Sequence, residues 1–197
     1  NYCWNVEDMG EDYISDRVIR SASLYRPERL NDIIASDWKF DVNPDYIELA
    51  FSNECNFKCG YCHPNSSSRF MSEIKKFGPY DMVKNHRLDI DWFKAYEEHE
   101  NPYVEAWWKW YPEVVKTLSI LRLTGGEPLM HKSTWRLFEE LHRNPQPHLE
   151  LNINTNLGVK EKFVDNLAAN VNLIREKNAV KSFALYTSID CWNERAE

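Results

Sequence analysis

Three cysteines within eight residues, Cys55, Cys59 and Cys62 in the segment CNFKCGYC, are the side chains of this sequence best suited to chemistry. Thiolates are preferred ligands of iron–sulfur clusters and of zinc. A structural zinc ion takes four protein ligands, usually from two separated pairs. Three thiolates on a [4Fe–4S] cluster instead leave one iron without a protein ligand. The spacing therefore favours a cluster with an open iron, and a zinc site completed by His63 or a distant ligand is the alternative.

A second segment, Leu-Thr-Gly-Gly-Glu-Pro-Leu at residues 123–129, contains two of the six glycines of the chain. Glycine permits unusual backbone angles and a close approach of the backbone to another group. Carbonyl oxygens and the carboxylate of Glu127 are suitable partners for an ammonium group. The segment therefore fits either a ligand-binding turn at Gly125 and Gly126 or an ordinary turn between a strand and a helix.

Short apolar segments alternate with amphipathic ones through most of the chain. We predict strands at 46–52, 118–124, 148–155 and 182–190, and helices at 133–143 and 160–177. Strands that alternate with helices predict a parallel α/β sheet, which binds its ligands at the carboxyl ends of the strands. Both motifs follow such strand ends.

The remaining segments are predicted to be an extension and an insertion. Residues 1–45 read as an irregular N-terminal extension with one short helix at 27–35. Residues 64–117 read as a helical insertion. We expect its helices at about 66–78, from about 89, and at 104–118.

The two motifs together resemble those of the radical S-adenosylmethionine (radical SAM) superfamily. This resemblance implies an α/β fold, a partial (β/α)6 barrel with a parallel sheet, of which residues 46–197 would contain about the first four strands. The core would then be incomplete at its C-terminal end. Because an unpaired fourth strand is an exposed edge that proteins avoid, we expect the sequence to be part of a longer protein.

The resemblance also implies roles for individual residues. Cys55, Cys59 and Cys62 would hold a [4Fe–4S] cluster whose open iron binds SAM. Further residues would contact SAM, namely Tyr61 near the adenine, Gly125, Gly126 and Glu127 at the methionine ammonium, Asn156 after the third strand, and Ser188 and Asp190 at the end of the fourth. Asn156 as a turn residue, and Ser188 or Asp190 as a helix cap, are the structural alternatives.

The activity implied is the reductive cleavage of SAM to methionine and a 5′-deoxyadenosyl radical, which abstracts hydrogen from a peptide or small-molecule substrate. An electron donor such as flavodoxin or ferredoxin would be needed, and the cluster would be sensitive to oxygen. The motif details resemble most closely the members that carry a C-terminal twitch domain. The alternative is a non-catalytic binding module organised by zinc or an iron–sulfur centre.

Composition restricts the partners and the compartment. The net charge of −7 disfavours nucleic-acid binding, which needs clustered cations. No apolar run reaches the roughly 18 residues of a membrane span, and the N-terminus lacks a signal-peptide pattern. Five cysteines, three of them within eight residues, disfavour a disulfide framework. We therefore expect a cytoplasmic protein that binds neither nucleic acid nor membrane.

Overall fold

The computed structural model describes residues 2–10, 12–22, 27–37, 39, 41–78, 80 and 101–188 of the 197-residue chain. The chain divides into two compact units, Asn1–Asp45 and Tyr46–Glu197. That these units are an extension and a radical SAM core stays a prediction. The helix predicted from about residue 89 and the candidate residue Asp190 lie outside the described residues.

The first unit contains three short helices, α1 (Tyr2–Glu7), α2 (Asp16–Ala22) and α3 (Pro27–Ala35). The prediction of α3 is confirmed, with proline at its first position, where the missing N–H costs no hydrogen bond. The description of this region as irregular was wrong for α1 and α2. These helices have six and seven residues, too few to establish a helical period in the sequence.

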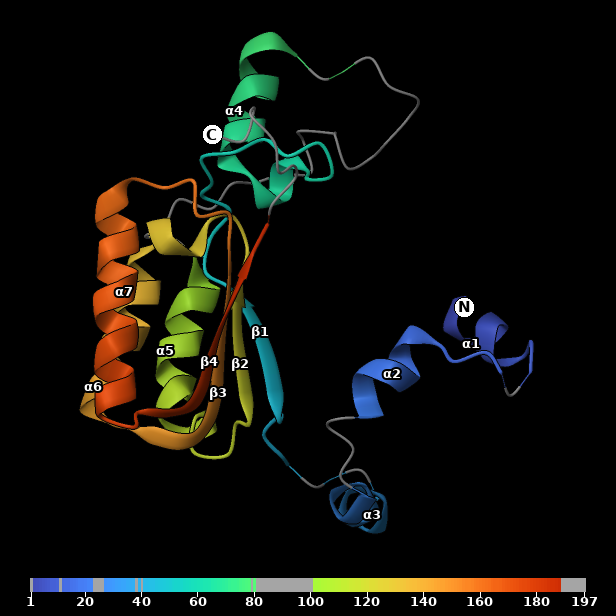
Figure 1. The fold of residues 1–197 in the computed structure, drawn as a ribbon. Coiled ribbons are helices and arrows are strands. Elements are labelled where there is room, and N and C mark those ends of the chain that lie inside the picture. Colours follow the sequence, from blue (N-terminus) through green and yellow to red (C-terminus); the bar gives the residue numbers. More distant parts are fainter. Residues whose placement is uncertain are drawn as a thin grey trace. The chain divides into compact units, whose positions relative to one another are not determined.

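The second unit is built on four parallel strands in the order β1-β2-β3-β4 (Figure 1). Their bounds are β1 Tyr46–Ala50, β2 Ile120–Thr124, β3 Gln146–Thr155 and β4 Val180–Thr187. All four predicted strands are present, and the predicted parallel α/β sheet is confirmed. Ala50 pairs with Thr124, so the cysteine loop and the glycine turn begin at the same edge of the sheet.

Three helices, α5 (Pro102–Val114), α6 (Lys132–Arg143) and α7 (Glu161–Glu176), cover one face of this sheet (Figure 1). Alternate residues of a strand point to the same face of the sheet, and the residues that point towards these helices are apolar. Leu121 and Leu123 of β2 and Leu151 and Ile153 of β3 are completely buried in this core.

The intervening residues give the sheet a second, polar face. Arg122 and Asn154 alternate with the buried leucines and isoleucine, and the Arg122 Nε donates a 2.9 Å hydrogen bond to Asn154 Oδ1. The Arg122 guanidinium also lies 5.0 Å from the centre of the Tyr186 ring. These polar side chains lie near the carboxyl ends of the strands, where the two motifs begin.

Both ends of α5 and the start of β2 differ from the predictions. The predicted helix at 104–118 begins at Pro102 and ends at Val114, and the following strand begins at Ile120. Leu118, which we assigned to both elements, lies in the connection and is completely buried. Leu118 is apolar because it packs in the core, although it belongs to neither the helix nor the strand. Among the described residues, no helix is both long and apolar enough to cross a membrane.

Candidate functional site

The cysteine loop follows β1 and runs from Cys55 to Cys62. The Cys62 N–H donates a 2.9 Å hydrogen bond to the Cys59 carbonyl, which closes a turn between these two cysteines. The Phe57 N–H points at the Cys55 Sγ, 3.4 Å away. All three cysteines of the loop are free and partly buried.

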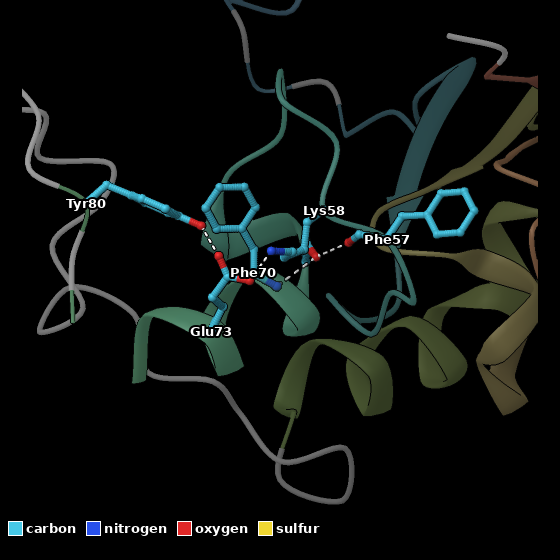
Figure 2. A network of polar contacts seen from close by, with 6 residues as sticks. Phe57, Lys58, Phe70, Glu73 and Tyr80 are labelled. Carbon is cyan, nitrogen blue, oxygen red and sulfur yellow. Dashed lines mark hydrogen bonds and ion pairs between the residues drawn. The ribbon is translucent and has the colours of Figure 1, made fainter. Parts of the chain in front are cut away.

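The N-terminus of helix α4 (Ser68–Phe77) holds this loop from one side. Ser67 is the N-cap of this helix, and its Oγ accepts a 3.2 Å hydrogen bond from the Phe70 N–H. The same hydroxyl donates a 2.7 Å hydrogen bond to the Phe57 carbonyl (Figure 2). Ser68 Oγ accepts a hydrogen bond from the Cys55 N–H at 3.1 Å. The serines therefore cap the helix and orient the loop at the same time.

An outer set of contacts joins the same two segments at the surface. Lys58 in the loop pairs with Glu73 on α4, and the Tyr80 hydroxyl donates to the same carboxylate (Figure 2). The Tyr80 ring packs edge-on against Phe70 at 5.7 Å. The hydrogen bond from Lys58 is the largest effect that holds the pKa of Glu73 below its usual value. Because such pairs are exposed, we expect them to contribute little to stability.

The glycine turn after β2 packs against the start of the cysteine loop. Gly125 has a φ of 109°, and a Cβ at Gly126 would overlap the Glu54 carbonyl. The Gly126 N–H donates to the Ser52 carbonyl at 3.1 Å, and the Glu127 N–H donates to the Glu54 carbonyl at 2.6 Å. The close approach expected of these glycines is therefore made, at least in part, to the protein's own backbone.

Glu127 lies behind this turn and is only 2% exposed. Its Oε1 accepts hydrogen bonds from the Thr155 hydroxyl at 2.6 Å and the Leu129 N–H at 3.1 Å. Its Oε2 accepts a 2.7 Å hydrogen bond from the Asn156 N–H. The carboxylate thus links the end of β2 to the end of β3. Its expected contact with the SAM ammonium stays a prediction.

A cavity of about 310 Å³ lies where these segments meet at the strand ends. Most of the candidate residues line it, namely Cys55, Cys59, Tyr61, Cys62, Gly125, Gly126, Asn156 and Ser188. Glu127 is not among the lining residues. The structure therefore gathers into one place candidate residues that are up to 133 positions apart in the sequence, the separation of Cys55 and Ser188.

Six lining residues were not predicted as site residues, and three of them, Phe57, Ser66 and Thr155, lie next to predicted ones or in the segments that carry them. The other three are Glu48 of β1, Thr124 of β2 and Asn154 of β3. Each belongs to a strand that the sequence analysis identified. The period of two along the strands placed Asn154 opposite the buried Ile153, and a systematic use of that alternation would have found these residues.

Asn156, directly after β3, reaches the cysteine loop. Its Nδ2 lies 3.1 Å from the Asn56 Oδ1 and 3.8 Å from the Cys55 Sγ. In return, Asn56 Nδ2 donates a 2.8 Å hydrogen bond to the Gly158 carbonyl. The intervening Leu157 adopts a left-handed conformation, with φ of 52°. Asn156 therefore lies in the connection after β3 and lines the cavity, and its contact with SAM stays a prediction.

The surroundings of Cys55 favour its neutral thiol in the absence of a metal. Burial is the main cause that raises the pKa of Cys55, the Phe57 N–H partly opposes it, and the negative charge of Glu127 adds to it. A bound metal would reverse this preference, because coordination deprotonates a thiol.

The donor set of the cavity fits an iron–sulfur cluster. The three cysteines line one shared cavity. Separately, within the described residues no three His, Cys, Asp or Glu side chains are grouped closely enough to hold a metal ion. This arrangement suits a group that offers each thiolate a different metal atom.

Residues 49–175 match the family model of the radical SAM superfamily. The match covers more than half of the chain, and the chain therefore belongs to this superfamily. The family and the partial radical SAM fold predicted from the motifs are confirmed. Members of the superfamily use a [4Fe–4S] cluster and SAM, so these two cofactors are the ones that the cavity is expected to receive.

The curated relatives that match are enzymes named GTP 3′,8-cyclase. The protein from Nautilia profundicola is 30% identical over 118 residues, which are 60% of this chain and 29% of the relative. A Helicobacter pylori protein is 26% identical over 123 residues, which are 62% of this chain and 30% of the relative. This chain thus spans less than a third of these relatives. No solved structure gives a significant match. Membership of the twitch-domain subgroup stays a prediction.

Proposed function

We propose that this chain forms the cofactor-binding core of a radical SAM enzyme, with Cys55, Cys59 and Cys62 as ligands of a [4Fe–4S] cluster. The observation that carries this proposal is the single cavity shared by the three cysteines and the glycine turn. When bound and reduced by an electron donor, the cluster would supply the one electron that cleaves SAM to methionine and a 5′-deoxyadenosyl radical, and this radical would abstract a hydrogen atom from substrate.

The protein's part in this reaction is to bind and orient SAM. Backbone carbonyls of Gly125 and Gly126 are suitable partners for the methionine ammonium. Tyr61 lies at the cavity with 69% of its surface exposed, so its ring is available to pack on the adenine. Asn156 and Ser188 add polar groups on the side of β3 and β4. Asp190 keeps its proposed role as a SAM contact.

Glu127 acts through the backbone that it holds. Its hydrogen bonds from Thr155 and Asn156 hold the end of β3 against the turn after β2, and its third bond, from the Leu129 N–H, lies within that turn. The negative charge remains close enough to the cavity to affect the Cys55 thiol, and it would favour a cationic ligand there. We therefore propose that Glu127 stabilises the SAM site as a whole, in addition to any direct contact.

The substrate is proposed only as a class, a peptide or a small molecule. The names of the matching relatives make GTP the first small molecule to test. An electron donor of the flavodoxin or ferredoxin type would supply the reducing electron.

The test is anaerobic reconstitution with iron and sulfide, followed by dithionite and SAM, with 5′-deoxyadenosine quantified with and without GTP. The proposal predicts an iron–sulfur cluster in the wild type, and its loss in Cys59→Ala. The matched control is Cys3→Ala, which removes a thiol of the first unit and should retain the cluster. Tight zinc binding without iron, or the absence of SAM binding, would instead support the non-catalytic binding module.

A further inference from the structure

Two N–H groups, one within the cysteine loop and one just after β3, point at the sulfur of Cys55. One is the backbone N–H of Phe57, at 3.4 Å. The other is the side-chain amide of Asn156, at 3.8 Å. Among the contacts of the described residues, Cys59 and Cys62 accept no such hydrogen bond, and Cys62 instead points its thiol at the His63 carbonyl. The three cysteines of the site therefore have different surroundings.

The orientation of the Asn156 amide is determined by its neighbours. Its Oδ1 accepts a 2.8 Å hydrogen bond from the Gly158 N–H, which assigns this atom as the acceptor. Its Nδ2 then faces an acceptor, the Asn56 Oδ1, as well as the Cys55 sulfur. A reversed amide would place two oxygens and two N–H groups against each other. Asn156 can therefore only donate to Cys55.

The backbone around Asn156 is held as firmly as its side chain. Its N–H donates to the buried carboxylate of Glu127 at 2.7 Å. On the other side, Asn56 Nδ2 donates to the Gly158 carbonyl at 2.8 Å. A Cβ at Gly158 would overlap the Phe57 ring, so this turn lies directly against the cysteine loop. These contacts fix the distance between the end of β3 and Cys55.

We propose that Asn156 is a positioning residue that orients the Cys55 sulfur and raises the reduction potential of the cluster. This inference rests on the proposed function. The reduction adds one electron, from dithionite in the assay, to [4Fe–4S]²⁺ and gives [4Fe–4S]⁺, with no bond broken and no proton transferred. Hydrogen bonds to cluster sulfurs stabilise the more negative state, and they are among the factors that set the potential.

The measurement is a redox titration of the reconstituted protein, followed by electron paramagnetic resonance of the reduced cluster. Asn156→Leu keeps the approximate volume and removes the donor. We expect the equilibrium constant for reduction to fall about tenfold, which is about 59 mV for a one-electron couple. Asn156→Asp keeps the acceptor for the Gly158 N–H but replaces the donor with a negative oxygen, so its potential should fall further.

The matched control is Asn56→Leu, the same change on the other side of the contact. This variant removes the hydrogen bonds between Asn56 and the β3 end but leaves the Asn156 donor in place. We expect the equilibrium constant for reduction to change by less than about twofold from wild type, which is about 18 mV in the potential. Amide exchange of residues 55–62 in the cluster-free proteins should increase in both leucine variants, which separates loop mobility from the effect on potential.

The outcomes distinguish this inference from the proposed function. Wild-type potentials in cluster-loaded Asn156→Leu and Asn156→Asp would overturn the inference and leave the proposed function intact. An equal shift in Asn56→Leu and Asn156→Leu would also overturn it, because the effect would then come from the loop. Should Asn156→Leu hold no cluster, Asn156→Asp gives the same comparison. Absence of a cluster in the wild type would overturn both proposals.

Discussion

The backbone N–H of Asn156 donates a 2.7 Å hydrogen bond to the Oε2 of Glu127. This bond crosses from the end of β3 to the turn after β2, and the Thr155 hydroxyl makes a parallel bond to Oε1 at 2.6 Å. The carboxylate is almost completely buried, its bonds to Thr155 and Leu129 are buried, and its bond to Asn156 is partly buried. Glu127 is therefore expected to matter for the folded state even when no cofactor is present.

Replacing Glu127 with Gln tests this structural role. All three partners of the carboxylate are donors, so one of them would face the new NH₂ group and lose its acceptor. Leaving a buried donor unpaired costs about 1–3 kcal/mol. We expect the melting temperature of the cluster-free protein to fall by about 2–4 °C for each kcal/mol.

The control for this change is Glu139→Gln on the exposed side of α6, which should leave the melting temperature unchanged. Measurements by circular dichroism under anaerobic conditions suffice. Wild-type stability of Glu127→Gln, combined with weaker SAM binding, would mean that Glu127 acts only on the ligand.

Two glycines of the site should respond very differently to alanine. At Gly126 the added Cβ would overlap the Glu54 carbonyl, and the backbone there cannot give way without moving the cysteine loop. At Gly60, inside the loop, nothing lies within 4 Å of the added atom. We expect Gly126→Ala to cost at least about 3 kcal/mol in unfolding free energy, at the upper end for overpacking.

Urea denaturation of the two alanine variants makes the comparison, with Gly60→Ala expected to match wild type within about 1 kcal/mol. Similar midpoints for both variants would show that the turn after β2 does not pack against the loop as described. Cluster content after reconstitution gives a second readout, which should fall only in Gly126→Ala.

The sheet and the site were predictable to different degrees. Strand and helix patterns of the second unit are strong because β2 and β3 bury one face completely, which gives a clear alternation. The cysteines and glycines were recognisable from residue type and spacing alone. Helices α1 and α2 were missed because six or seven residues do not establish a period.

The contacts that arrange the site could not be predicted from local patterns. Glu127 meets Thr155 and Asn156 across 28 and 29 positions of sequence. Asn56 meets Asn156 across 100 positions. Such hydrogen bonds depend on the register of β2 and β3 and on the path of each turn. Residue types therefore identified the candidates, while the three-dimensional structure was needed to separate residues that line the cavity from Glu127 behind it.

Ser67 should be more important than its position as a helix cap suggests. Its hydroxyl accepts from the Phe70 N–H and donates to the Phe57 carbonyl, and the side chain is completely buried. Ser67→Ala removes both bonds, so we expect a loss of about 1–2 kcal/mol in urea denaturation. Ser72→Ala on the exposed side of the same helix is the control and should change stability by less than about 0.5 kcal/mol. An equal effect of the two changes would contradict a role for Ser67 in holding the loop.

The reactivity of Cys55 should depend on pH in a direction set by its burial. Burial raises the pKa of this thiol in the folded protein, and only the thiolate reacts with alkylating agents. In the cluster-free protein we therefore expect alkylation of Cys55 by iodoacetamide to reach half its maximal rate above about pH 8.5, the ordinary cysteine value. Peptide mapping by mass spectrometry identifies the residue, and the same chain unfolded in urea is the matched control.

The same shift determines two further effects of pH on the cluster-free protein. Because the folded-state pKa is the higher one, the contribution of Cys55 to stability is complete below the unfolded-state pKa and is lost as pH rises through the folded-state pKa. Metal loading needs the thiolate, so reconstitution should be faster at pH 8.5 than at pH 7. The prediction would be refuted if alkylation of Cys55 reached half its maximal rate at the same or a lower pH in the folded protein than in urea. The surroundings of Cys55 would then not disfavour the thiolate.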